Sequence, residues 1–267
     1  MPAFSLSEDL DFAFRLADAA RAAILPHFRQ SRAVDNKLSD GEFDPVTMAD
    51  RASERAMRDI ILAERPGDGV LGEEFPVTPS QNGRSWTLDP IDGTRGFISG
   101  LPTWAVLIAM TKNSIPVLGV IDQPYTDERY FGDGQTSELV HAGNSPLSLK
   151  TSTIDDLSDA TLATTDPYLF HGKESAAFDQ IRKSVRLTRF GCDAYAYACL
   201  AHGQVDLVVE SGLQPFDVQA LIPVVEGAGG VISNWRGGSA KDGGQVVAAA
   251  TPALHKTTLD FLADAAQ

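Results

Sequence analysis

The chain has 267 residues, of which 43% are hydrophobic and 22% are charged, proportions typical of a globular protein rather than a disordered or fibrous one. Its formal net charge of −14 argues against a nucleic-acid partner, because nucleic-acid phosphates require a basic surface. The longest apolar runs are too short to cross a bilayer, so no membrane span is expected. The first residues lack the basic and apolar regions of a signal peptide, and we therefore expect a cytoplasmic protein.

Two helices are predicted near the start of the chain. Residues 7–29 carry apolar side chains near helical spacing, and Pro26 predicts a kink or an early stop. Residues 47–64 form the second predicted helix, with Thr47 as the N-cap and Asp50 completing an acidic capping box.

The periodicity then changes to that of strands, arranged as an antiparallel meander with a turn at 112–114. These strands are predicted at 85–88, 103–110, 115–121, 129–131 and 137–141. Further strands are predicted at 162–164, 185–190, 205–210 and 230–233, and helices at 173–183, 193–202, 215–228 and 252–265. Helices, then a meander, then alternating strands and helices predict a layered mixed α/β (α+β) fold. Its two halves, 1–149 and 150–267, are expected to meet near residue 150.

The two cysteines, Cys192 and Cys199, border one predicted helix and lie seven residues apart. At a rise of ~1.5 Å per residue they are roughly 10 Å apart, beyond the ~7 Å that a disulfide tolerates. We expect buried free thiols, and their spacing suits no zinc motif.

The strongest local signal is a turn that carries Asp89 and Asp92 directly after a predicted strand. Two carboxylates this close repel each other unless a cation lies between them. Hard cations such as Mg²⁺ take oxygen ligands, including a main-chain carbonyl such as that of Ile91. Gly93 permits close approach of the backbone, and the N–H groups of Gly93 and Thr94 could grip a phosphate. Taken alone, the motif fits an Asx turn equally well.

Three other acidic motifs each have an ordinary structural explanation. Glu73 and Glu74 could lie in a solvated loop, and Asp50 could simply cap its helix. Asp217 could favour the dipole of the helix that it opens.

Taken together, however, the four motifs resemble those of the inositol monophosphatase family, within the superfamily of lithium-sensitive, metal-dependent phosphatases. In chain order the motifs are 44–50, 72–74, 89–94, and Asp217 with glycine-rich residues 227–230 downstream. The resemblance covers nearly the whole chain. It implies a layered α/β/α/β/α sandwich of the inositol monophosphatase and fructose-1,6-bisphosphatase type, a small phosphate monoester as substrate, and a homodimer.

The resemblance also implies roles by position. The expected ligands of two or three Mg²⁺ ions per subunit are Glu73, Asp89, the Ile91 carbonyl, Asp92 and Asp217. Thr94 and Asp50 are expected to orient and deprotonate the attacking water, with Glu74 nearby. Many family members have Trp before the last aspartate, and Phe216 is a departure that indicates a subfamily.

Residues 95–104, 191–197 and 209–217 resemble the histidinol-phosphate phosphatase branch of this family. Histidinol is cationic at its amine and partly at its imidazole, so its pocket should present carboxylates. Asp193 and Glu210 are the candidates, although Asp193 could be an N-cap and Glu210 an exposed strand end. The residues expected to bind substrate are Gly93, Thr94, Arg95, Asp193, Glu210 and Asp217.

Arg95 and two tyrosines in these segments allow more than one interpretation. Arg95 could contact the phosphate or could pair with surface acids. Tyr195 and Tyr197 could shape the pocket, but aromatic residues at this spacing more often belong to the core.

The sequence therefore predicts Mg²⁺-dependent hydrolysis of a phosphate monoester, foremost L-histidinol phosphate in histidine biosynthesis, by in-line attack of water at a two-metal site. An inositol monophosphatase, or a phosphatase of another sugar or nucleotide phosphate, is the nearest alternative. A catalytically silent metal-binding scaffold would lack a ligand, and none is missing. A purely structural Mg²⁺ or Ca²⁺ protein would leave Thr94 and Asp50 unexplained.

Overall fold

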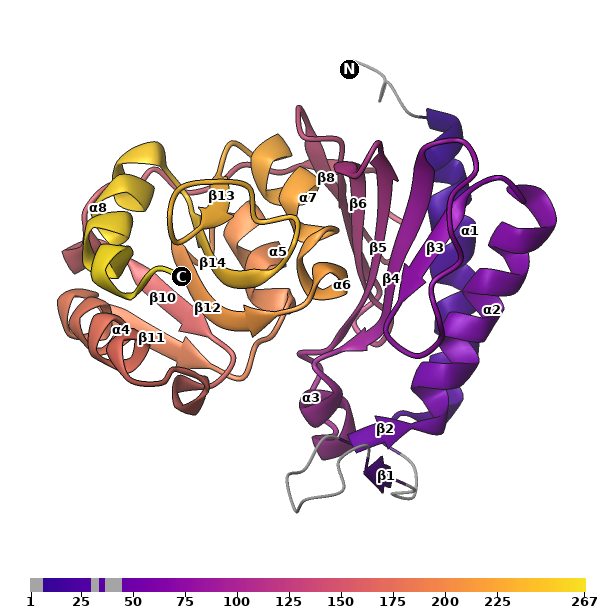
Figure 1. Ribbon diagram of the computed structural model, residues 1–267, viewed down its shortest axis with the longest axis horizontal. Helices are drawn as coiled ribbons and strands as arrows, with labels where there is room; N and C mark the ends of the chain where they lie inside the picture. Colours follow the sequence, from indigo (N-terminus) through magenta and orange to yellow (C-terminus); the bar gives the residue numbers. More distant parts are fainter. Residues whose placement is uncertain (1–6, 30–33, 37–44) are drawn as a thin grey trace.

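The structure, a computed structural model, describes residues 7–29, 34–36 and 45–267. Within these ranges two β-sheets stand side by side, with helices between them and on both outer faces (Figure 1). This order of layers confirms the predicted α/β/α/β/α sandwich. The first predicted motif begins at Asp44, which lies outside the described residues.

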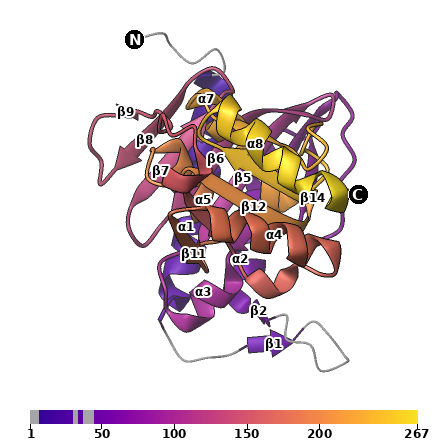
Figure 2. The ribbon, with the colours of Figure 1, turned by 90° about the vertical axis from the view of Figure 1, so that its left-hand side faces the viewer.

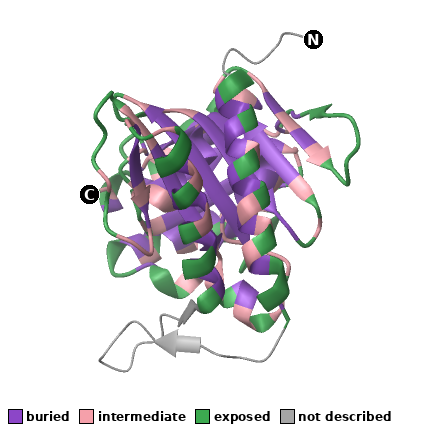
Figure 3. Ribbon diagram, turned by 90° about the vertical axis from the view of Figure 1, so that its right-hand side faces the viewer, coloured by how far each residue is buried: buried purple, intermediate pink, exposed green. Residues whose placement is uncertain are grey.

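The first outer layer consists of α1 (Ser7–Ile24) and α2 (Met48–Glu64). Their inward faces are buried against the first sheet, and their outward faces are exposed (Figure 3). The predicted helix 7–29 ends early because Pro26 has no N–H to donate, and η1 (Leu25–His27) forms a 3-10 turn instead. The predicted stop at Pro26 is confirmed, and the predicted end at residue 29 is wrong.

A short antiparallel ribbon precedes α2. It pairs β1 (Val34–Asn36) with β2 (Pro45–Thr47), and neither strand was predicted. The side chain of Thr47 lies outside the described part of the chain. Its role as N-cap, and the capping box with Asp50, therefore stay predictions.

The first sheet has seven strands and is antiparallel except where β3 and β4 run parallel. In spatial order its strands are β3 (Gly69–Gly72), β4 (Arg84–Asp92), β5 (Ala105–Lys112), β6 (Ile115–Gln123), β7 (Glu128–Gly132), β8 (Ser137–His141) and β9 (Leu147–Ser148). The predicted meander is confirmed. The two short edge strands β3 and β9 were not predicted.

The predicted strand 85–88 is too short, because β4 continues through the acidic motif to Asp92. Asp89 lies opposite Leu107, and Asp92 lies opposite Ala105. The chain therefore advances three residues along β4 while it advances only two along β5. Pro90 has no N–H for the ladder, which is consistent with a bulge at this point. The bulge turns the end of the strand and brings both aspartates to the edge of the sheet.

The second sheet has five strands, in the order β11-β10-β12-β14-β13. Their bounds are β10 (Thr161–Thr164), β11 (Leu187–Phe190), β12 (Leu207–Leu213), β13 (Val231–Asn234) and β14 (Gly244–Ala249). Helices α4 (Lys173–Ser184) and α8 (Pro252–Leu262) cover its outer face (Figure 2). Strand β14 was not predicted.

Three helices form the middle layer: α5 (Tyr195–Ala201), α6 (Pro215–Val218) and α7 (Leu221–Gly227). The predicted single helix 215–228 is wrong, because the chain breaks between α6 and α7. Pro223 cannot donate to the carbonyl four residues earlier, which belongs to Gln219. The break leaves Asp217 in a short helix of its own.

Three buried apolar clusters fill the spaces between the layers. Alternate side chains of a strand point to opposite faces, so Leu107 of β5 enters the central cluster and Ile108 enters the cluster beneath α1 and α2. At Gly119 of β6, an added Cβ would lie 2.0 Å from the carbonyl oxygen of Ala220. Only glycine lets the middle layer lie this close to the first sheet.

The structure also bears on three broader expectations. Both cysteines are free thiols, as predicted, although Cys192 and Cys199 are half-buried rather than buried. In the described part of the chain, no helix has the length and apolar character needed to span a bilayer.

The chain leaves the first sheet at Ser148 and enters the second at Thr161. The division into halves 1–149 and 150–267 stays a prediction.

Candidate active site

Three carboxylates from two distant parts of the chain meet between the two sheets. Asp89 and Asp92 lie at the end of β4, and Asp217 lies in α6. Each can offer an oxygen atom within 4.8 Å of the others. A buried hydrogen bond of 2.7 Å from the Thr87 hydroxyl to the Gln219 Oε1 atom ties β4 to the residues just after α6. The family resemblance placed all three residues in one site, and the structure brings them together.

The cluster has the character of a site for a hard cation. Asp89 is 2% exposed, and its Oδ1 atom has no hydrogen-bond partner among the described residues. The backbone N–H of Ala194 donates to Asp92 at 2.6 Å, and that of Gln214 donates to Asp217 at 2.7 Å. These bonds orient two of the carboxylates. The donor set consists of oxygen atoms only, which suits a divalent cation such as Mg²⁺ or Ca²⁺.

Burial raises the pKa of each of the three aspartates, and neighbouring like charges add to the effect at Asp89 and Asp92. Burial and then the Glu73 carboxylate raise the pKa of Asp89 well above its usual range. Burial and then Asp193 raise the pKa of Asp92 in the same direction. Burial raises the pKa of Asp217 to about 6, although the Gln214 N–H opposes the change. Carboxylates this close favour either a bound proton or a bound cation.

Glu73 and Glu74 follow β3, which runs parallel to β4 and ends beside it. Glu73 is not among the three carboxylates within 4.8 Å, but its charge acts on Asp89. The Glu74 carboxylate is almost fully buried and pairs with Arg51 at 3.4 Å. The structure therefore places Glu73 beside the cluster and turns Glu74 toward α2.

Thr94 opens α3 (Thr94–Ser99), a helix that was not predicted. Gly93 precedes it with φ of 81°, a left-handed conformation that favours glycine. The Thr94 hydroxyl donates to the Ile91 carbonyl oxygen at 3.1 Å. Asp50 on α2 is 1% exposed, and its charge raises the pKa of Asp89, with a smaller effect than burial and three other acids. These residues border the carboxylate cluster.

Asp193 is not the N-cap that its position allowed, because α5 begins at Tyr195 and Ala194 is the cap. Its own backbone has φ of 45°, outside the helical range. A Cβ added at Gly93 would lie 3.2 Å from the Asp193 side chain, so this carboxylate faces the turn that follows Asp92. Burial raises its pKa to about 6, against the effects of Arg95 and the Thr165 hydroxyl.

Arg95 is mostly exposed and pairs with Asp166 at 3.5 Å. Its charge also reaches Asp193, whose pKa it lowers against the effect of burial. The predicted pairing of Arg95 with a surface acid is confirmed, and its contact with the phosphate stays a prediction.

Glu210 is not an exposed strand end, because it is 1% exposed in the middle of β12. It accepts hydrogen bonds from the Thr165 N–H at 2.7 Å and from the Thr164 and Thr165 hydroxyls at 3.1 Å. Burial raises the pKa of Glu210 to about 8 despite these bonds. A buried carboxylate whose described partners are all neutral is well suited to bind a cation.

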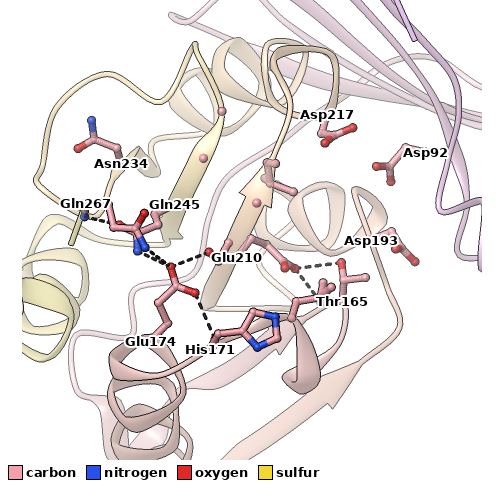
Figure 4. Close-up of a pocket in the computed structure, with 16 residues that line it drawn as sticks. Asp92, Thr165, His171, Glu174, Asp193, Glu210, Asp217, Asn234, Gln245 and Gln267 are labelled. Carbon is pink, nitrogen blue, oxygen red and sulfur yellow. Dashed lines mark hydrogen bonds between the residues drawn. The ribbon is translucent and has the colours of Figure 1, made fainter. Parts of the chain in front are cut away.

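A cavity of about 710 Å³ extends from Asp92 and Asp217 past Asp193 and Glu210 to Glu174 on α4 (Figure 4). The Glu174 carboxylate accepts hydrogen bonds from the side chains of Ser211, Gln245 and Gln267 at its far end. Among the described residues, no lysine or arginine lines this cavity. Five of the sixteen described lining residues are Asp or Glu, and His171 is the one basic side chain among them, so the ionisable groups of the wall are mostly acidic.

The sequence allows Tyr197 as a pocket residue or as a core residue, and it is both, since it belongs to the central apolar cluster and lies beside the carboxylates. Tyr197 is 2% exposed, but its hydroxyl has no hydrogen-bond partner in the described part of the chain. It lines a second cavity of about 20 Å³ together with Asp92, Glu210 and Asp217, large enough for about one water molecule. No local pattern distinguishes this tyrosine from a core residue, so the sequence alone could not assign it to the site.

Comparison with known proteins gives consistent matches over nearly the whole chain. The Inositol monophosphatase family matches residues 5–267. The chain is 39% identical over 259 residues to a bifunctional phosphatase, IMPL2, of Arabidopsis thaliana, covering 92% of this chain and 72% of that protein. It is 36% identical over 256 residues to a histidinol-phosphatase of Chlorobaculum parvum, covering 95% and 96%. A solved inositol monophosphatase from Zymomonas mobilis is 40% identical with a TM-score of 0.86, covering 98% of this chain and 100% of that one.

Proposed function

Since the chain belongs to the inositol monophosphatase family of phosphatases, we propose that it hydrolyses L-histidinol phosphate with the aid of Mg²⁺. The observation that carries the proposal is the acidic cavity that opens directly from the three-carboxylate cluster. An anionic phosphate group would bind at the cluster, and a cationic group on the alcohol would extend along the acidic wall. The similarity to the histidinol-phosphatase of Chlorobaculum parvum supports the same substrate.

The proposed ligands for two or three Mg²⁺ ions per subunit are Asp89, Asp92 and Asp217, with Glu73 and the Ile91 carbonyl. The proximity of the three aspartates and the buried Asp89 oxygen fit a cation that takes oxygen ligands. When bound, such ions neutralise the phosphoryl oxygens and lower the pKa of the attacking water.

The chain's own residues would orient the reactants. The Thr94 hydroxyl donates a hydrogen bond to the Ile91 carbonyl oxygen, so the lone pairs of the hydroxyl oxygen are left to accept a hydrogen bond from water. Asp50 would take the proton of that water, with Glu74 nearby. The N–H groups of Gly93 and Thr94 would hold the phosphate, and Arg95 could add a contact from the surface.

The reaction follows from this arrangement. The water oxygen forms a bond to phosphorus while the ester P–O bond breaks in line, and no covalent enzyme intermediate is needed. The alcohol leaves as it gains a proton from solvent water, Asp50 returns to solvent the proton that it took from the attacking water, and inorganic phosphate is the second product.

Asp193 and Glu210 would select the cationic alcohol. Both carboxylates line the cavity next to the cluster, and inositol offers no positive charge to match them. A hydrogen bond to a charged group contributes about 1.5–3 kcal/mol, or roughly ten- to a hundredfold in specificity.

Asp193→Asn and Glu210→Gln are each expected to lower kcat/KM for L-histidinol phosphate by roughly ten- to a hundredfold. Hydrolysis of a phosphate ester whose alcohol is uncharged, such as glycerol 2-phosphate, should change little, because the metal ligands are untouched. The ratio of the two kcat/KM values is the measurement. Asp179→Asn, on the exposed surface of α4, is the matched control and should leave the ratio unchanged.

An inositol monophosphatase is the second candidate, and the similarity to the Zymomonas mobilis enzyme favours it. A ratio that stays at the wild-type value in both variants would support this alternative and remove the cation-selecting role. By family resemblance we also propose a homodimer, which sedimentation equilibrium of the purified protein would test.

A further inference from the structure

One face of α2 carries three buried charged residues at successive helical turns. Asp50, Glu54 and Arg58 are spaced four residues apart, and their exposed fractions are 1%, 0% and 8%. Charged side chains are rarely buried unless each has a partner, because their desolvation is costly. This face points toward the end of β3. The next residue after β3 is Glu73, the proposed metal ligand.

Glu54 and Arg58 form an ion pair that also binds the backbone of this turn. The Arg58 Nε atom donates to Glu54 Oε1 at 2.6 Å. The Glu74 backbone N–H donates to Glu54 Oε2 at 2.7 Å. The Arg58 Nη2 atom donates to the Phe75 carbonyl oxygen at 3.1 Å. The pair thus holds the chain at the two residues that follow Glu73.

The residue before Glu73 is held as well. A Cβ added at Gly72 would lie 2.1 Å from Glu54 Oε1, so the end of β3 lies directly on the Glu54 carboxylate. The same carboxylate therefore contacts the backbone on both sides of Glu73. From this position Glu73 acts on Asp89, whose pKa is raised by burial and then by Glu73.

We propose that Glu54, held by Arg58, is a positioning residue that fixes the Glu73 turn beside Asp89 for metal binding. The proposal rests on the proposed role of Glu73 as a metal ligand. Glu54 itself contacts backbone and Arg58, and it acts on the metal only through the geometry of the turn. An outer group of this kind typically contributes ~10–100-fold to metal affinity.

Calorimetric titration of the metal-free protein with Mg²⁺ tests the proposal without an activity assay. Glu54→Gln keeps the shape of the side chain but can accept only one of its two hydrogen bonds, because its amide nitrogen is a donor. We expect its Mg²⁺ affinity to fall by ~10-fold or more. Excess Mg²⁺ should restore most of kcat. Glu64→Gln is the control, since Glu64 lies on the same helix but pairs with Arg15 at the surface.

Two further variants keep the test decisive. If circular dichroism shows that Glu54→Gln does not fold, Arg58→Lys takes its place in the test. This variant retains the charge but loses the planar guanidinium that reaches Phe75. It should also weaken Mg²⁺ binding. Glu73→Gln tests the ligand itself. Lost affinity in Glu73→Gln with unchanged affinity in folded Glu54→Gln and Arg58→Lys overturns the positioning role and leaves the proposed function intact. Unchanged affinity in Glu73→Gln overturns both the ligand assignment and the positioning role.

Discussion

Removal of divalent cations with excess chelator is expected to abolish phosphate release, and added Mg²⁺ is expected to restore it. The physical reason is the cluster of Asp89, Asp92 and Asp217, whose oxygens lie within 4.8 Å of one another. Without a cation these carboxylates repel each other and repel the phosphate. Release of phosphate is measured before chelation, after it, and after addition of Mg²⁺. By family resemblance, Li⁺ should inhibit in the presence of Mg²⁺.

The variant that matches this experiment is Asp92→Asn, which removes a charge but keeps the shape of the side chain. Its activity is expected to be severely reduced, and its Mg²⁺ affinity should fall with it. Asp179→Asn at the surface of α4 controls for the loss of one negative charge elsewhere. Undiminished turnover of the wild-type protein in excess chelator would contradict the proposed mechanism.

Thr94→Ala is expected to slow the chemical step by ~10²–10⁴-fold, the usual contribution of a positioned group that assists proton transfer. The hydroxyl is held against the Ile91 carbonyl at 3.1 Å, and its loss removes the group that would orient water. Mg²⁺ binding should remain largely intact, since Thr94 supplies no side-chain ligand. Single-turnover kinetics at saturating Mg²⁺ measures the chemical step.

Thr94→Ser is the matched control, because it keeps the hydroxyl and should retain most of the rate. Metal titration separates the two roles that Thr94 could have. If Thr94→Ala loses Mg²⁺ as severely as Asp92→Asn, then Thr94 supports the metal site and is not a water-orienting residue.

The elements that local patterns predicted well are the long ones. The meander strands are apolar runs bounded by turn residues, and β5 is buried on both faces, so its signal is strong. Strand β3 has only four residues and was missed. The break between α6 and α7 depends on Pro223. It was not predicted, because the apolar periodicity of 215–228 continues across this proline.

The positions of several site residues could not be predicted from local sequence, because they depend on contacts between distant parts of the chain. The pairing of Asp89 with Asp92 follows from their spacing, but nothing local brings Asp217 to them. Only the family resemblance placed it there. Glu54 looks like an ordinary polar residue of an amphipathic helix, because burial by the turn after β3 depends on tertiary structure. The sequence allows Tyr197 as a pocket or a core residue, and its position beside the carboxylates likewise depends on tertiary structure.

Phosphate release by the purified protein in Mg²⁺ tests the central claim most directly, with L-histidinol phosphate, inositol 1-phosphate and a nucleoside monophosphate as parallel substrates. The expected result is a kcat/KM for L-histidinol phosphate at least tenfold above the other two, on the order of the contribution of one charged hydrogen bond. Equal or faster hydrolysis of inositol 1-phosphate would contradict the cation-selecting cavity. No release from any of the three esters, with Mg²⁺ bound, would contradict the assignment as an active phosphatase of these substrates.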